Sequence, residues 1–133
     1  MTTGASIIGF LLRQDIEPDP LVPPASVKAG RLPDGSINAL LVRTISSIER
    51  IELVRGSTVR ITDRVGVTVR AESYREQVAI MAWVKRRCAG FVGDIAGAAR
   101  VAVLPAGTGP DVPGPGNSFE QTTDFRVSAD VAA

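Results

Sequence analysis

This chain lacks histidine and has a single cysteine, two residue types on which much catalysis and metal binding depends. The 133 residues contain no histidine, which excludes a Ser-His-Asp triad, a Cys-His pair and a histidine-ligated metal. The single cysteine, Cys88, excludes an internal disulfide and a cysteine-rich metal cage. We therefore expect a protein that is not an enzyme, with no catalytic residues, no cofactor and no metal.

Cys88 and the carboxylates are the remaining candidates for chemistry. Cys88 lies on the apolar side of a predicted helix, and Arg86 and Arg87 point elsewhere around that helix, so a core position is favoured over a nucleophile. Asp124 and Asp130 share one strand face but are separated by roughly 20 Å, too far for paired acid–base catalysis. A small enzyme working through carboxylates or arginines stays the least favoured alternative, because it needs a convergent polar cluster.

Arginines form a row in the segment 58–71. Arg60, Arg64 and Arg70 fall at its even positions, and period-two alternation puts even positions on one face of a strand. One interpretation is a solvated sheet face. The other is a contact surface, on which the arginines pair with acidic residues of a neighbouring copy or line a path for nucleic acid. No aromatic residue stands beside them, which argues against stacking on single strands.

The overall balance of charge and hydropathy limits the class of protein. Lys and Arg number 15 and Asp and Glu number 14, a net charge of +1, whereas domains that mainly neutralise phosphates are strongly basic. No apolar run reaches the length of about 18 residues that a membrane span needs. The apolar stretch near the N-terminus lacks the preceding positive charge of a signal peptide. We expect a single soluble domain over 1–133, made in the cytoplasm.

Two helices are predicted. Residues 3–14 put four apolar side chains on one face at helical spacing. The second helix begins after Ser73, which forms a capping box with Glu76, and it ends near Gly90 and Gly93.

The clearest strands are 58–71 and 118–131, whose apolar residues alternate with polar ones. Shorter strands are expected at 26–32, 37–45 and 99–105. Together with the helices, these strands predict an α+β fold: a mostly antiparallel β-sheet with two α-helices packed on one face.

Four local features complete the predicted fold. Residues 46–56 carry several charges and alternate poorly, so we expect an irregular β-hairpin arm that protrudes from the core. Asp63 and Gly66 interrupt the pattern of 58–71, and either is a candidate bulge. The Gly/Pro-rich segment 106–117 is predicted to be a loop without regular structure. It lacks the Gly-Lys-Ser/Thr ending of a phosphate-binding loop.

The order of these motifs resembles a known family. In 64–85 an alternating strand leads through a short polar link with an aromatic residue into a helix. Phe-Val-Gly at 91–93 follows the helix, and the last strand, 119–128, contains Asp-Phe-Arg-Val at 124–127. With the N-terminal helix and the Leu-Pro-Asp-Gly turn at 32–35, this order resembles the phage tail terminator, or tail-completion, family, which also occurs in prophages and gene transfer agents.

The resemblance implies a virion protein assembled in the bacterial host cytoplasm. It implies a homo-oligomer, a hexameric ring, on the head-proximal end of the tail, where it stops polymerisation of the tail tube. The implied partners are the major tail tube protein, the head–tail connector or stopper protein, and double-stranded DNA that passes through the lumen without sequence readout. A neighbouring head–tail connector (neck) protein of similar size remains the alternative.

Two segments depart from the family pattern. The arm 44–56 is charged and lacks aromatic residues, and the Gly/Pro-rich loop 105–117 is long. Charged residues of the arm and of the arginine row are the expected subunit or lumen contacts: Glu49, Arg50, Glu52, Arg55, Arg60, Arg64 and Arg70.

Overall fold

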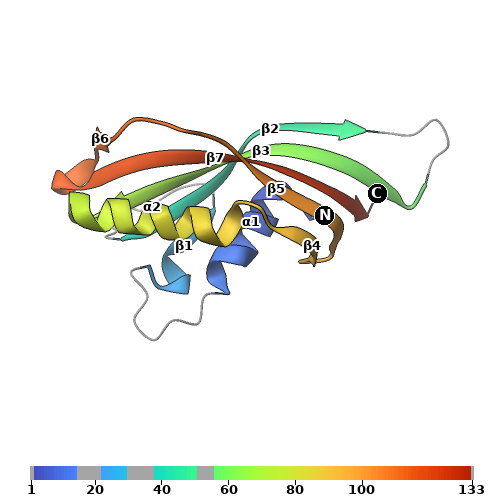
Figure 1. The fold of residues 1–133 in the computed structure, drawn as a ribbon, viewed down its shortest axis with the longest axis horizontal. Helices are drawn as coiled ribbons and strands as arrows, with labels where there is room; N and C mark the ends of the chain where they lie inside the picture. Colours follow the sequence, from blue (N-terminus) through green and yellow to red (C-terminus); the bar gives the residue numbers. More distant parts are fainter. Residues whose placement is uncertain (1, 15–21, 30–37, 51–55, 133) are drawn as a thin grey trace.

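A computed structural model, which describes residues 2–14, 22–29, 38–50 and 56–132, contains a curved sheet with two helices against one face (Figure 1). The helices are α1 (Gly4–Arg13) and α2 (Tyr74–Cys88), and short 3₁₀ turns cover Pro24–Ser26 and Pro115–Asn117. The strands are β1 (Val27–Ala29), β2 (Ala39–Arg50), β3 (Thr58–Ala71), β4 (Val92–Ile95), β5 (Ala98–Thr108), β6 (Val112–Pro113) and β7 (Phe119–Ala132).

The strands follow the order β1-β2-β3-β7-β5-β4, and β6 pairs with β7. β1 lies parallel to β2, and the other described pairs are antiparallel. β3 and β7 are the two long alternating strands of the sequence, and they pair along their whole length, from Thr58 opposite Ala132 to Ala71 opposite Phe119. This arrangement confirms the predicted α+β class with a mostly antiparallel sheet.

The core lies between the helices and the odd-numbered positions of β3 and β7. Val65, Val67 and Phe125 are fully buried there, because period-two alternation turns every second side chain toward the helices. The apolar face of α1 covers β3, and Thr3 caps the helix by accepting a hydrogen bond from the backbone of Ser6. Neither described helix is long and apolar enough to cross a membrane.

Asp63 does not interrupt β3, as its polarity suggested, but continues the buried face. Its side chain is only 2% exposed. Its carboxylate accepts the backbone N–H of Gly4 at 2.8 Å and the hydroxyl of Ser47. An anion is favourable at this point because the first amides of a helix are unpaired and carry partial positive charge. Gly4 is required here, since an added Cβ would lie 2.6 Å from the Cβ of Asp63.

The bulge lies on a different strand from the one expected. β3 pairs with β7 without a shift of register, whereas the pairing of β2 with β3 shifts between Thr44 and Ser46. Ile45 is the extra residue of this bulge. Its Cδ1 lies 3.0 Å from the position that a Cβ would take at Gly66, so Ile45 fills the space that a side chain there would need. Gly66 is therefore the counterpart of the bulge and not the bulge itself.

The predicted arm is more regular than expected. Residues 46–50 continue β2 and pair with Arg60–Arg64 of β3, so the hairpin extends the sheet beyond the helices (Figure 1). Every residue from Arg43 to Arg50 is exposed. The poor alternation of this segment reflects a strand with solvent on both faces. Residues 51–55 of the arm lie outside the described residues, as does the predicted turn at 32–35.

The region after α2 contains strands that the sequence pattern did not predict. β4 follows α2 almost at once, where Gly93 (φ 145°) tolerates a backbone conformation that other residues rarely adopt. β5 continues through Pro105 to Thr108, into the segment predicted to be a loop. Within that segment, Val112 and Pro113 also pair with β7. Pairing with the long β7 imposes regular structure that glycine and proline disfavour locally.

Candidate functional site

The candidate site is the face of the sheet that points away from the helices, here called the outer face. It carries the even-numbered side chains of β3 and β7 together with their cross-strand neighbours on β2. Along these three strands it holds six arginines and three carboxylates: Arg43, Arg50, Arg60, Arg64, Arg70, Arg126, Glu120, Asp124 and Asp130. Positive charge therefore predominates on a protein whose overall net charge is only +1.

The arginine row predicted from the sequence is present, and each member contacts a carboxylate of β7 in the same chain. Arg70 Nε lies 2.7 Å from Glu120, directly opposite in the register. Arg64 donates to Asp124 from Nε at 3.0 Å and from a terminal nitrogen at 2.8 Å.

The row continues at Arg60, which lies opposite Asp130 with a nitrogen–oxygen separation of 3.2 Å. Cross-strand pairs of opposite charge stabilise a sheet only modestly. Contact with carboxylates of the same chain accounts for the row without requiring a neighbouring copy.

Asp130 joins two arginines at one end of the row. Arg100, from β5, donates to its carboxylate, and Arg60 contacts the same group. The hydrogen bond from Arg100 lowers the pKa of Asp130, with a smaller contribution from Arg60, and Asp130 in turn raises the pKa of Arg100. The lowered pKa of Asp130 and the raised pKa of Arg100 keep this pair charged over the physiological pH range.

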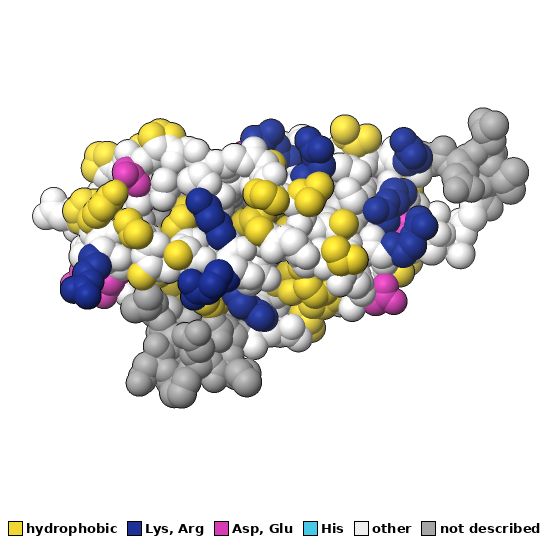
Figure 2. Space-filling view, in the orientation of Figure 1, with side chains coloured by type: hydrophobic (Ala, Val, Ile, Leu, Met, Phe, Trp, Pro, Cys, Tyr) yellow, Lys and Arg dark blue, Asp and Glu magenta, His cyan; other side chains and the backbone are white. Residues whose placement is uncertain are grey.

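The predicted contacts in the arm lie on both sides of the sheet. Arg50 shares the outer face with Arg60, its register partner, whereas Glu49 lies opposite Ile61 and points to the helix side. Both residues are exposed. Glu52 and Arg55 lie outside the described residues. Figure 2 shows basic side chains along the visible face, including the end where the hairpin of β2 and β3 projects.

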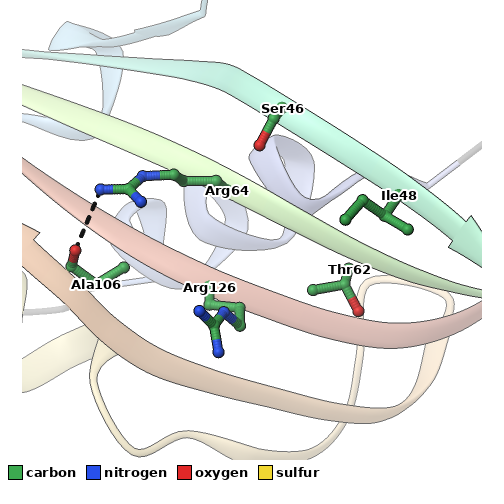
Figure 3. A pocket seen from close by; sticks show the side chains of 6 residues that line it. All are labelled: Ser46, Ile48, Thr62, Arg64, Ala106 and Arg126. Atoms are coloured by element: carbon green, nitrogen blue, oxygen red, sulfur yellow. Dashed lines mark hydrogen bonds between the residues drawn. The ribbon is translucent and has the colours of Figure 1, made fainter.

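A shallow hollow of about 170 Å³ opens on the outer face. β2, β3, β5 and β7 contribute its lining: Ser46, Ile48, Thr62, Arg64, Ala106 and Arg126 (Figure 3). The Arg64 guanidinium also donates to the carbonyl of Ala106 at 3.2 Å, across the width of β7 (Figure 3). The hollow combines guanidinium and hydroxyl groups, which are hydrogen-bond donors, with one exposed apolar side chain.

The remaining reactive groups are placed for structure. Cys88 is fully buried, and this burial raises the pKa of its thiol to about 12, with Arg87 acting weakly in the opposite direction. A thiol with such a pKa is a poor nucleophile. The Arg87 guanidinium donates to the Leu11 carbonyl and so ties α2 to α1. Within the described residues, no three Cys, Asp or Glu side chains gather as metal ligands would.

Arg126 and the carboxylates opposite the arginine row are parts of this face that the sequence pattern did not reveal. The signal was present, because Asp124, Arg126 and Asp130 occupy alternate positions of the last predicted strand. Their meaning depended on which strand lies beside 58–71, and alternation alone does not determine the neighbour or its register.

Comparisons with known proteins bear on the fold. No family model matches the chain, and no curated protein sequence matches it. Among solved structures, the chain is similar to a chain of the "Virion of native gene transfer agent (GTA) particle", with a TM-score of 0.65. The match covers 96% of this chain and 94% of that one at 13% sequence identity. A likeness over nearly the whole of both chains at this identity establishes a shared fold.

Proposed function

We propose that this chain is a structural protein of a virion and, more specifically, a ring-forming tail terminator. In this role it caps the head-proximal end of the tail tube, stops polymerisation of the tube and forms the joint to the head connector. The observation that carries the proposal is the likeness in fold, over 96% of this chain, to a chain of a gene transfer agent virion. The order of sequence motifs supports the narrower assignment.

The open edges of the sheet support self-assembly. β1 pairs only with Leu40–Val42, so the rest of β2 presents an edge without a partner strand among the described residues. β4 ends the sheet on the other side, and its Val92 is 77% exposed. Unpaired strand edges favour contact with another chain. In a head-to-tail interface, one edge of each subunit contacts a different edge of the next subunit. Such an assembly closes into a ring when the rotation that relates neighbouring subunits adds up to a full turn.

The projecting hairpin supports the same conclusion. Ile45 and Ile48 are 47% and 69% exposed on β2, on the outer face, which points away from the helices. A strand with solvent on both faces gains little from burial within its own chain. A neighbouring copy paired along the open edge of β2 is the partner that the ring supplies, and it leaves the outer face open. The tube protein and the connector contact the two ends of the ring.

Assembly of the purified protein tests the proposal. We expect native mass spectrometry to give a closed oligomer, a hexamer by the family resemblance, and negative-stain images to show rings with a central opening. A chain that stays monomeric, alone and in the presence of tail tubes, would contradict the proposal.

Charge reversal on the hairpin shows whether the ring uses this surface. Glu49→Arg should leave the fold intact, because Glu49 is exposed, and should weaken ring formation by placing a repulsive charge in the interface. Glu72→Arg makes the same change at an exposed position just before α2 and serves as the matched control. If the two variants assemble equally well, the hairpin is not part of the interface between subunits.

A further inference from the structure

The hollow on the outer face contains an unfavourable pair of charges. Arg64 on β3 and Arg126 on β7 are direct register partners. Directly opposite side chains on one face of an antiparallel pair have Cβ atoms about 4.5–5.5 Å apart, and like charges at such positions destabilise the sheet. The other members of the arginine row, Arg60 and Arg70, face carboxylates across the same strand pair, so this position departs from the pattern.

Only one member of the pair is neutralised by the chain itself. Arg64 donates to the Asp124 carboxylate. It also donates to the carbonyl of Ala106 (Figure 3). Arg126 is exposed and contacts no carboxylate in the described part of the chain. Within the described residues its guanidinium makes no hydrogen bond, so its N–H donors are left for another partner.

The space beside Arg126 is suited to an oxyanion. The volume of about 170 Å³ exceeds that of several water molecules, each of which occupies about 30 Å³ in the liquid. Ser46 and Thr62 add hydroxyl donors to the two guanidinium groups that line the hollow. The Thr62 hydroxyl also lies 3.3 Å from that of Ser128, which holds it in the lining.

We propose that this hollow binds a phosphate group of a nucleic-acid backbone, with Arg126 as its main ligand. A phosphate offers more acceptor oxygens than a carboxylate and matches the planar donors of arginine. The surrounding outer face carries twice as many arginines as carboxylates along its three central strands, and none of the outward-facing positions there is aromatic. Such a surface favours backbone contact without base stacking.

The choice of a duplex over free phosphate depends on the proposed function, in which DNA passes through the ring. In that setting the outer face lies toward the lumen, and each subunit supplies one weak phosphate contact. A single contact of this kind binds the DNA too weakly to stop its passage, because the interaction energy is small and is screened by salt.

Binding of a fluorescein-labelled 20-base-pair duplex to the full chain, followed by anisotropy, tests the inference. We expect Arg126→Gln to weaken binding at low salt by about 3- to 10-fold. We expect it also to reduce the slope of log K against log salt by about one for each phosphate that Arg126 no longer neutralises. Arg86→Gln removes the same charge from the exposed side of α2 and should change neither quantity appreciably. Arg126→Lys should give an intermediate affinity, because it keeps the charge but not the planar fork.

Competition by inorganic phosphate and by poly-glutamate identifies the chemistry. Phosphate should compete in the wild type and should not do so in Arg126→Gln. Equal duplex binding by Arg126→Gln and Arg86→Gln would overturn the inference. Arg126-dependent binding of poly-glutamate without duplex binding would also overturn it and would assign the hollow to a carboxylate of another protein.

The same preparations distinguish this inference from the proposed function. Native mass and images report the ring, and anisotropy reports the phosphate site. Rings with duplex binding that does not depend on Arg126 would contradict only the phosphate site. Arg126-dependent duplex binding by a protein that never forms rings would contradict only the terminator role.

Discussion

Replacement of Asp63 by alanine should destabilise the protein more than any other removal of a single carboxylate in the described residues. Asp63 is 2% exposed and accepts the buried N–H of Gly4 at the start of α1, together with the Ser47 hydroxyl. Without the carboxylate the Gly4 amide is left buried and unpaired, at a cost of about 1–3 kcal/mol. Removal of the negative charge at the helix N-terminus adds about 0.3–1 kcal/mol.

The expected destabilisation is therefore about 1–4 kcal/mol, a large part of the roughly 5–15 kcal/mol by which domains are stable. Urea unfolding followed by circular dichroism, at one fixed protein concentration, measures it. Asp63→Asn keeps an acceptor for the Gly4 amide and should cost about 1 kcal/mol.

The control for this series is Glu72→Ala, which removes an exposed carboxylate and should stay within about 0.5 kcal/mol of the wild type. If Asp63→Ala unfolds at the same urea concentration as Glu72→Ala, then Asp63 does not hold α1 on the sheet and the reasoning is refuted.

Three further predictions concern the core, the thiol and the acid response. Phe125→Ala should cost about 3–5 kcal/mol in urea unfolding, because the ring is fully buried; a cost below about 1 kcal/mol would contradict its place in the core. Cys88 should react with a thiol reagent at about pH 8 only through unfolding, since burial raises its pKa to about 12; labelling at the rate of a free cysteine would contradict this. The lowered pKa of Asp130 gives stability that is present above the unfolded-state pKa and is lost as pH falls through the folded-state pKa. Asp130→Asn should therefore lose less stability than the wild type between about pH 6 and pH 2, and parallel pH profiles would refute the assignment.

The long alternating strands and both helices were predictable because each carries its signal in its own residues. β3 and β7 alternate over 14 residues each. Ser73 starts α2 by accepting a hydrogen bond from the Glu76 amide, which is one half of the predicted capping box; the return hydrogen bond to the Glu76 side chain is not present among the described residues. β4, β6 and the extension of β5 carry no such signal. Their residues become strands because β7, or a strand already paired to it, provides hydrogen-bonding partners along its edge.

The candidate site was only half predictable for the same reason. The alternation of polar and apolar residues predicted that Arg60, Arg64 and Arg70 share one face of the strand, and they share one face in the structure. Their carboxylate partners follow from the pairing of β3 with β7, and the bulge at Ile45 follows from the close approach of β2 to Gly66. Both are contacts between segments distant in sequence, and the local pattern of charge or hydropathy does not encode them.

The position of this chain in the assembled particle tests the central claim most directly. A cryo-electron-microscopy reconstruction of the intact particle should contain one ring of this chain at the head-proximal end of the tail tube, between the last ring of tube protein and the connector. A chain found along the tube, in the neck above the terminal ring, or absent from the particle would contradict the account.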